Sequence, residues 1–129
     1  KGYFWLATRP EFVGEFSQAG ALVRHEGIGR WLASEPQDQW PDGYTLTEAI
    51  KEGWDQFYGD RKQELVFIGL SAQMNEKKIR QDLDACLIID YKNDPEIYWG
   101  IKDPFPAWFP EDLEGSDSID EQELVLSTA

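Results

Sequence analysis

The chain has very few of the side chains that bind transition metals or act as catalytic bases. Its 129 residues include one cysteine, Cys86, and one histidine, His25. A structural zinc site needs four Cys or His ligands at short paired spacings. A serine or cysteine nucleophile needs a base and an acid that orients it. The single cysteine excludes an internal disulfide and is typical of a reducing compartment, so we expect a cytoplasmic protein.

Basic residues and long apolar runs are also scarce. The chain has 12 Lys and Arg against 25 Asp and Glu, a formal net charge of −13. Nucleic acids and anionic membranes are bound through clustered basic side chains, so neither is an expected partner. No apolar run approaches the roughly 18 to 20 residues that span a bilayer. The phosphate-binding spacing GxxxxGK[ST] is absent as well. We therefore expect no enzyme activity and no bound cofactor for this chain alone.

The acidic residues are unevenly placed. Residues 103–129 contain eight acidic residues and no Lys or Arg, and the preceding 102 residues carry 17 acidic and 12 basic side chains. We predict a domain over residues 1–102. The prolines of Asp103–Pro110 predict an extended aromatic strap on that domain, and the acidic tail after it is expected to be disordered.

The first third of the chain predicts antiparallel strands at Gly2–Thr8, Phe12–Gln18 and Ala21–Glu26. Arg9-Pro10 is expected to end the first strand, because proline lacks a backbone donor and restricts the residue before it. Ala19-Gly20 is expected to link the other two strands as a hairpin.

A fourth strand is predicted in Gly59–Gly69, GDRKQELVFIG, where a charged turn leads into apolar residues. Leu65–Ile68 is apolar on both faces, which indicates a central strand covered on both sides. A dimer partner or a neighbouring domain is expected to supply the second cover.

Two helices are predicted downstream of an irregular segment, Gly27–Gly43, in which Trp31 and Trp40 are the expected anchors. The first helix begins with the capping-box pattern Thr45-Leu46-Thr47-Glu48 and is expected to run for about three turns. Its apolar stripe is formed by Leu46, Ile50, Trp54 and Phe57. The second helix covers Asn75–Ile88, and its stripe is formed by Ile79, Leu83, Cys86 and Leu87. This order of elements predicts an α+β fold, an antiparallel sheet of about four strands with two or three helices packed on one face.

The candidate site residues each have a structural interpretation beside the functional one. We favour a packed His25 and a hydrophobic Cys86 over metal ligands. The alternative is a weak metal-binding or metal-buffering module that uses His25, Cys86 and tail carboxylates. Asp60 and Arg61 either fix the start of the fourth strand, or Arg61 and Glu64 are presented to a partner protein.

Several blocks of the sequence closely resemble the C-terminal domain of the CobW family of GTP-dependent metallochaperones. The blocks occur in the order KGYFWLATRPEFVGEFSQAG, GRW, GDRKQELVFIG and LDACL, and DPFPAW resembles a downstream extension seen in some members. In this family a helix usually precedes the strand that contains KGYFWLA, whereas the present sequence begins at that strand.

The resemblance implies a longer parent protein with an N-terminal P-loop GTPase domain that carries GTP, Mg²⁺ and a Cys-rich zinc-binding motif. Family members deliver zinc or other metals, including cobalt for cobalamin synthesis, to client proteins. We therefore expect a non-catalytic C-terminal domain that contacts the GTPase domain, a client metalloprotein or a second copy. An aromatic-rich sheet would provide the contact surface, with Trp5 and Phe16 as candidates beside Arg61 and Glu64.

Overall fold

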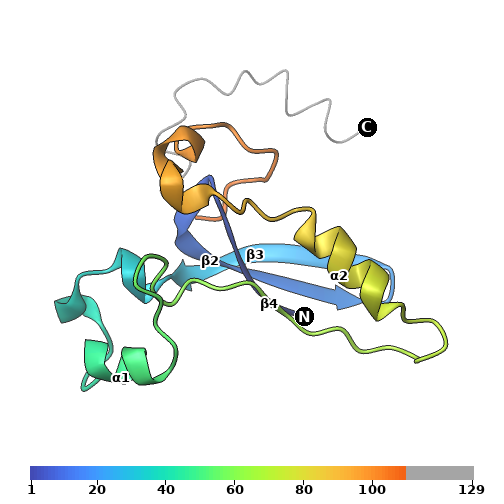
Figure 1. Ribbon diagram of the computed structural model, residues 1–129, viewed down its shortest axis with the longest axis horizontal. Helices are drawn as coiled ribbons and strands as arrows, with labels where there is room; N and C mark the ends of the chain where they lie inside the picture. Colours follow the sequence, from blue (N-terminus) through green and yellow to red (C-terminus); the bar gives the residue numbers. More distant parts are fainter. Residues whose placement is uncertain (110–129) are drawn as a thin grey trace.

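A four-stranded antiparallel sheet forms the centre of the domain, in a computed structural model that describes residues 1–109 (Figure 1). The strand order is β3-β2-β1-β4. The strands are β1 (Gly2–Leu6), β2 (Arg9–Ala19), β3 (Leu22–Arg30) and β4 (Glu64–Leu65). Together with two α-helices, this sheet confirms the predicted α+β class.

The β2–β3 hairpin turns one residue later than the sequence pattern predicts. Ala19 pairs with Leu22, so the turn consists of Gly20 and Ala21. Gly20 has a φ of 60°, a conformation that two-residue hairpin turns require at their first central position and that glycine adopts without a steric penalty.

The prediction that Arg9-Pro10 ends the first strand is wrong. β1 already ends at Leu6, and Leu6 pairs with Arg9 across a tight turn, so Arg9 and Pro10 begin β2. Pro10 has no registered partner on β1 or β3. Its missing N–H therefore costs no ladder hydrogen bond at this position.

The prediction of a central strand at Leu65–Ile68 is also wrong. β4 covers Glu64–Leu65 and lies at the edge of the sheet beside β1. Beyond it Val66, Phe67 and Ile68 have exposed fractions of 56%, 42% and 93%. A run of apolar residues is consistent with an inner strand, but it does not say which backbone lies beside it.

The first helix, α1 (Leu46–Lys51), is shorter than predicted. Thr45 and Glu48 form the predicted capping box, but Gly53 has a φ of 100° and turns the chain away after two turns. The buried residue of α1 is Ala49, and Ile50 is 59% exposed. Ile50 and Phe57 of the predicted apolar stripe are exposed, whereas Leu46 and Trp54 are half-buried and the Trp54 ring centroid lies 5.3 Å from that of Trp40. The stripe therefore packs only in part.

The second helix, α2 (Glu76–Asp84), has Asn75 as its N-cap, as predicted, because the Asn75 side chain accepts a hydrogen bond from the Lys78 amide. It ends before the predicted Ile88, at Asp84. Short 3₁₀ helices complete the described fold: η1 (Leu32–Ser34), η2 (Gln37–Gln39), η3 (Tyr91–Asn93) and η4 (Pro95–Tyr98).

The buried apolar residues lie largely outside the sheet. They are Trp31, Trp40, Ala49 and Tyr91, with exposed fractions of 4% to 7%. The Trp40 indole N–H donates to the carbonyl oxygens of Leu32 and Glu35 at 3.0 and 3.2 Å. Both predicted tryptophan anchors are thus confirmed. They hold the irregular segment and α1 as a small cluster at one end of the sheet, away from α2 (Figure 1).

The described part of the strap, residues 103–109, packs on one face of the sheet. Ring centroids lie 5.8 Å apart for Phe4 and Trp108, 4.9 Å for Phe12 and Phe109, and 5.0 Å for His25 and Phe105. A Cβ atom on Gly27 would lie 2.7 Å from the Phe109 ring, so the strap approaches the β3 backbone closely. The strap therefore covers residues of β1, β2 and β3. Val66, Phe67 and Ile68, for which we expected a second cover from another protein or domain, stay exposed, so that cover remains a prediction. The predicted disorder of the acidic tail concerns residues outside the described part.

Candidate interaction surface

The charged turn before β4 is held by hydrogen bonds within the chain. Both carboxylate oxygens of Asp60 accept backbone N–H groups at the start of η1, from Leu32 at 2.8 Å and from Ala33 at 2.9 Å. A carboxylate in this position satisfies donors that have no partner within a helix. Asp60 therefore ties the turn to the segment that follows β3.

Arg61 ties the same turn to β2. Its Nε donates to the Pro10 carbonyl at 2.6 Å, Nη1 to the Tyr58 carbonyl at 3.1 Å, and Nη2 to the Ser34 hydroxyl at 2.9 Å. All three acceptors are neutral, and burial lowers the pKa of the guanidinium. This geometry favours the structural interpretation of the GDRKQE turn, because the hydrogen bonds of Arg61 are made inside the domain.

Gln63 completes the edge of β1 with its side chain. The Trp5 N–H donates to Gln63 Oε1 at 3.3 Å, and Gln63 Nε2 donates to the Trp5 carbonyl at 3.0 Å. The side-chain amide thus takes the place of a neighbouring strand at Trp5. The sequence pattern offers no signal for this residue, since a glutamine in a charged turn is ordinary.

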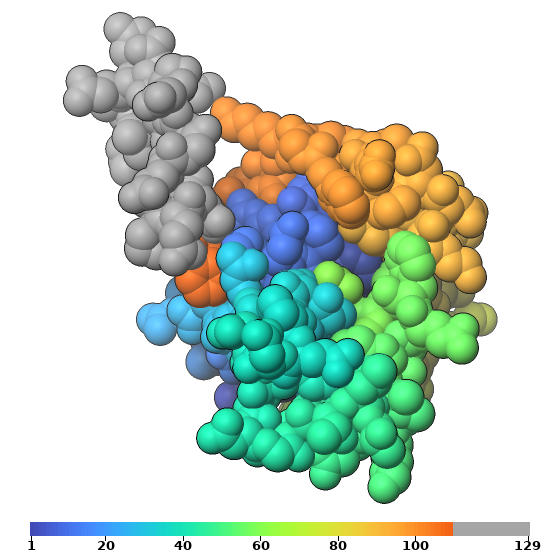
Figure 2. Space-filling view, turned by 90° about the vertical axis from the view of Figure 1, so that its left-hand side faces the viewer, coloured from blue at the N-terminus to red at the C-terminus, as the bar shows by residue number. Residues whose placement is uncertain are grey.

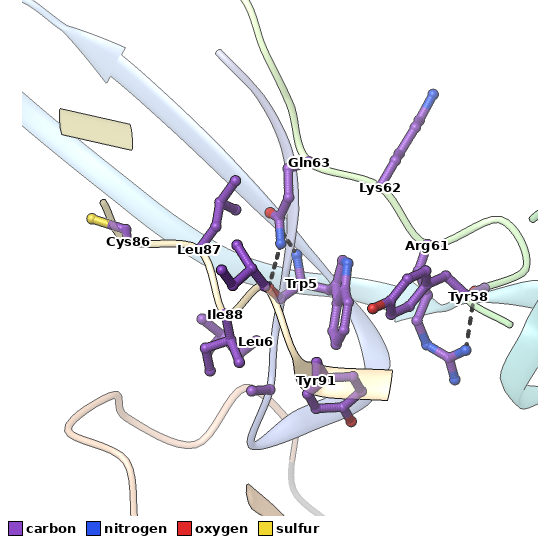
Figure 3. A pocket seen from close by; sticks show the side chains of 12 residues that line it. Trp5, Leu6, Tyr58, Arg61, Lys62, Gln63, Cys86, Leu87, Ile88 and Tyr91 are labelled. Atoms are coloured by element: carbon purple, nitrogen blue, oxygen red, sulfur yellow. Dashed lines mark hydrogen bonds between the residues drawn. The ribbon is translucent and has the colours of Figure 1, made fainter. Parts of the chain in front are cut away.

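A groove of about 490 Å³ lies next to this amide, between the β1 edge and the segment that follows α2. Figure 3 shows Trp5 and Tyr91 on one side of Gln63 and the apolar side chains of Leu87 and Ile88 on the other. The Trp5 ring centroid lies 4.9 Å from that of Tyr91 and 5.8 Å from that of Tyr58. We call this surface the Trp5 groove. Its lining residues are Trp5, Leu6, Ala7, Tyr58, Arg61, Lys62, Gln63, Cys86, Leu87, Ile88, Ile89 and Tyr91.

The Trp5 groove is rich in exposed apolar surface. Leu87, Ile88 and the neighbouring Ile89 have exposed fractions of 47%, 40% and 89%. On the face drawn in Figure 2 the N-terminal strands, in blue, are also left partly uncovered, between the cyan-to-green segment and the orange segment. Contiguous exposed apolar surface of this kind is typical of protein interaction sites.

The structure brings two of the four predicted interface residues to this groove. Trp5 and Arg61 both line it. Glu64 is exposed and forms an ion pair with Lys62 at 3.1 Å, an arrangement of little energetic weight at the surface. Phe16 is half-buried in β2, opposite Gly2 and His25, and it does not line the groove.

The two candidate metal ligands have unrelated surroundings. His25 packs edge-on against Phe105 of the strap, and its Nδ1 is buried without a hydrogen-bond partner. Cys86 lies beyond the end of α2, is exposed, and contacts the Asp82 carbonyl at 3.3 Å. Within residues 1–109 no three Cys, His, Asp or Glu side chains are grouped to hold a metal ion. A metal role for His25, Cys86 and the tail carboxylates stays a prediction.

An ion pair that the sequence did not reveal anchors the strap. Asp103 Oδ1 accepts from Arg9 Nη2 at 2.6 Å, and Asp103 Oδ2 accepts from Arg9 Nε at 2.9 Å and from the Thr8 hydroxyl at 2.6 Å. The two side chains are only 14% and 11% exposed. Burial raises the pKa of Asp103, but the hydrogen bonds from Arg9, Thr8 and the Phe105 N–H, with the Arg9 charge, outweigh it and lower that pKa.

Comparison with known proteins decides the family. Residues 1–87, more than half of the chain, match the family described as "Cobalamin synthesis protein cobW C-terminal domain". The chain belongs to this family. The predicted resemblance is thereby confirmed. The matched residues contain the sheet, both α-helices and the groove residues up to Leu87.

A curated relative extends the similarity beyond the matched domain. This CobW C-terminal domain is 37% identical over 108 residues to "Zinc-regulated GTPase metalloprotein activator 1" from Dictyostelium discoideum. The match covers 84% of this chain and 21% of the relative, so the chain spans about a fifth of the relative's length. Since the match is longer than the family domain, part of the similarity lies downstream of that domain. No solved structure matches the chain.

None of the helices in residues 1–109 combines the length and the apolar character that crossing a bilayer requires.

Proposed function

We propose that this CobW C-terminal domain is the non-catalytic contact domain of a GTP-dependent metal chaperone. Zinc is the proposed metal, with cobalt as the second candidate. Family membership supports this function, as does the name of the curated relative, which is a zinc-regulated GTPase metalloprotein activator. Hydrolysis of GTP, with its Mg²⁺, and tight zinc binding are assigned to an N-terminal P-loop domain of the same parent protein, in the cytoplasm.

The Trp5 groove is the proposed contact surface. It combines aromatic side chains from β1 and η3 with exposed aliphatic side chains at Leu87 and Ile88. Lys62 adds a positive charge to its lining in a chain that is acidic overall. Arg61 lines it as well, with its guanidinium hydrogen-bonded inside the domain. Aromatic and Arg residues are enriched where partner proteins bind tightly. The surface therefore suits the GTPase domain, a client metalloprotein or a second copy of the chain.

Leu87→Glu tests this surface. The substitution places a charge among apolar side chains, so binding to the separately expressed GTPase domain should weaken by about tenfold or more. Leu22→Glu is the matched control, because Leu22 is exposed to a similar degree, 55%, but lies at the turn of the β2–β3 hairpin. Equal binding of both variants and the unaltered domain would refute the groove as the contact surface.

Calorimetric titration with Zn²⁺ and with GTP tests the non-catalytic assignment. We expect no submicromolar binding of either ligand by the isolated chain, and such binding would overturn the proposal. Removal of residues 111–129 then addresses the buffering alternative. If tail carboxylates bind metal, weak uptake of Ca²⁺ or Mg²⁺ must fall in the shortened chain.

A further inference from the structure

The hydrogen bonds of Arg61 leave part of its guanidinium unused. A guanidinium carries five N–H donors, and Arg61 uses three of them for Pro10, Tyr58 and Ser34. The remaining two donors, one on each Nη atom, have no acceptor among residues 1–109. In the same part of the chain no acidic side chain forms an ion pair with Arg61. Arg61 is thus a half-buried cation that still has donors to offer.

Arg9 shows how this domain neutralises its other half-buried arginine. Both carboxylate oxygens of Asp103 accept hydrogen bonds from the Arg9 guanidinium. Asp60 does not do the same for Arg61, since its two carboxylate oxygens accept backbone N–H groups at the start of η1. Charged groups that are removed from water are normally paired, and burial lowers the pKa of the Arg61 guanidinium. An anionic group from a second molecule would supply the missing partner.

The acceptors of Arg61 surround a second pocket, of about 400 Å³. Pro10, Ser34 and Tyr58 all line it, and so does Arg61 itself. We call it the Arg61 pocket. Its remaining walls are largely aromatic and include Phe57, Tyr91 and Trp99.

The aromatic walls of the Arg61 pocket are both fixed and accessible. The Trp99 indole N–H donates to the Tyr91 hydroxyl at 3.0 Å, which holds the two rings together. Phe57 and Trp99 are 48% and 52% exposed. A ligand can therefore contact apolar ring surface and the guanidinium at the same time.

The Arg61 pocket is continuous with the Trp5 groove. Tyr58, Arg61 and Tyr91 line both of them, and the Tyr58 and Tyr91 ring centroids lie 6.4 Å apart. Figure 3 shows the Arg61 guanidinium on the side of Tyr58 that faces away from Leu87 and Ile88. A partner seated in the Trp5 groove would therefore reach Arg61 by passing the two tyrosines.

We infer that the Arg61 pocket binds the carboxylate of an Asp or Glu side chain that the partner protein presents next to apolar residues seated in the Trp5 groove. The inference rests on the proposed function and adds the chemistry of the partner. Its carrying observation is the half-buried guanidinium with two unused donors in an aromatic pocket. A carboxylate would accept charge-assisted hydrogen bonds from those donors.

A singly charged carboxylate suits this pocket better than other ions. Aromatic rings on their own can bind a cation, but the Arg61 guanidinium would repel one here. Glu11 also lines the pocket and is exposed, and its charge acts on Arg61 without forming an ion pair. Glu11 would repel a multiply charged anion such as phosphate more strongly than a carboxylate.

Two blocked peptides that differ by one charge test the inference on the unaltered chain. The probes are acetyl-Leu-Glu-Leu-amide and acetyl-Leu-Gln-Leu-amide, and binding is followed by NMR through the Arg61 Nε–H signal. The glutamate peptide should bind about tenfold or more tightly than the glutamine peptide, because its hydrogen bonds to the guanidinium are charge-assisted. Acetate should bind about tenfold or more weakly than the glutamate peptide, because it lacks the apolar side chains.

Arg61→Gln and Arg24→Gln form a matched pair of variants. Arg24 is exposed on β3 opposite Ser17 and lines neither the Trp5 groove nor the Arg61 pocket. Arg61→Gln should abolish the preference for the glutamate peptide, and Arg24→Gln should leave it unchanged. The Trp99 indole N–H signal reports binding in both variants. If Arg61→Gln does not fold, the two peptides still decide the question on the unaltered chain.

Several results would overturn the inference. Equal binding of the two peptides would show that no carboxylate is recognised, whether because Glu11 already neutralises Arg61 or for another reason. Acetate or inorganic phosphate that binds as tightly as the glutamate peptide would assign the pocket to a free anion.

Competition from this chain itself would also count against a partner protein. An Arg61 Nε–H signal that shifts with protein concentration would assign the pocket to a second copy. A shift on removal of residues 111–129, before any peptide is added, would assign it to the acidic tail. The proposed function is tested separately by the Leu87→Glu binding experiment, so either proposal can fail without the other.

Discussion

The Arg9–Asp103 ion pair allows a quantitative test of how the strap is held. Asp103 accepts three hydrogen bonds from Arg9 and Thr8 and a fourth from the Phe105 N–H at 3.0 Å. The Arg9 guanidinium also donates to the carbonyls of Phe105 and Pro106 and lies 4.8 Å from the Trp108 ring centroid. The strap is thus fastened largely through one arginine.

Asp103→Asn keeps the side-chain volume but removes the charge and leaves Arg9 without its carboxylate. Breaking one partner of a buried ion pair costs roughly 3 to 5 kcal/mol. Because both side chains retain some exposure, 14% and 11%, we expect about 3 kcal/mol in the free energy of unfolding. For a domain of this size that corresponds to a fall of about 10 °C in Tm.

The effect should depend on pH in a defined direction. The pKa of Asp103 is lowered in the folded state, below its unfolded value of about 3.9. Its stabilisation is therefore fully present above that pH and is lost as the pH falls through the folded pKa. The difference in unfolding free energy between the unaltered chain and Asp103→Asn should be constant near neutral pH and shrink below about pH 4.

Urea unfolding followed by tryptophan fluorescence measures this difference. Glu76→Gln is the control, because it removes a surface ion pair with Arg80 whose side chains are 76% and 74% exposed. That pair should contribute about 0.5 kcal/mol or less. If Asp103→Asn costs no more than Glu76→Gln, or if its cost does not shrink in acid, the ion pair does not anchor the strap.

Two further substitutions test the close approach of β1 to β4 and the turn that precedes β4. Gly2→Ala should destabilise the domain by about 2 kcal/mol or more, since the new Cβ would clash with the Glu64 carbonyl oxygen. Gly43→Ala is the control: a Cβ there has no atom within 4 Å, so only the positive φ of 78° should cost free energy, about 1 kcal/mol. Thermal unfolding compares the two, and equal losses would contradict the close β1–β4 approach. Arg61→Ala should lower the free energy of unfolding by about 2 kcal/mol, because three hydrogen bonds are lost. An unchanged Tm with weakened binding to the GTPase domain would instead assign Arg61 to the interface.

Features governed by neighbouring residues were predictable from the sequence. The capping box at Thr45 and the Asn75 cap depend on contacts three residues apart, and the β2–β3 hairpin depends on a glycine at its turn. The family was predictable as well, because its blocks are runs of specific residues in a fixed order along the chain. The helix lengths were less predictable, because Gly53 turned the chain where the apolar spacing alone suggested continuation.

The interaction surface was only partly predictable for the same reason. Trp5 and Arg61 could be named as candidates, since aromatic and Arg side chains are common at interfaces. Gln63 could not, because its role depends on the Trp5 backbone lying within reach of its amide, 58 residues away in the chain.

By itself, the sequence determined the family, the α+β class and the local caps, since each depends on residue types at short spacings. Only the tertiary structure decided that Leu65 belongs to an edge strand and which strands the predicted strap covers. Both depend on contacts between segments that are far apart in the chain. Asp103, for example, pairs with Arg9 from 94 residues away. Hydrophobicity and charge favour such contacts, but which two residues meet is determined by how the whole chain packs.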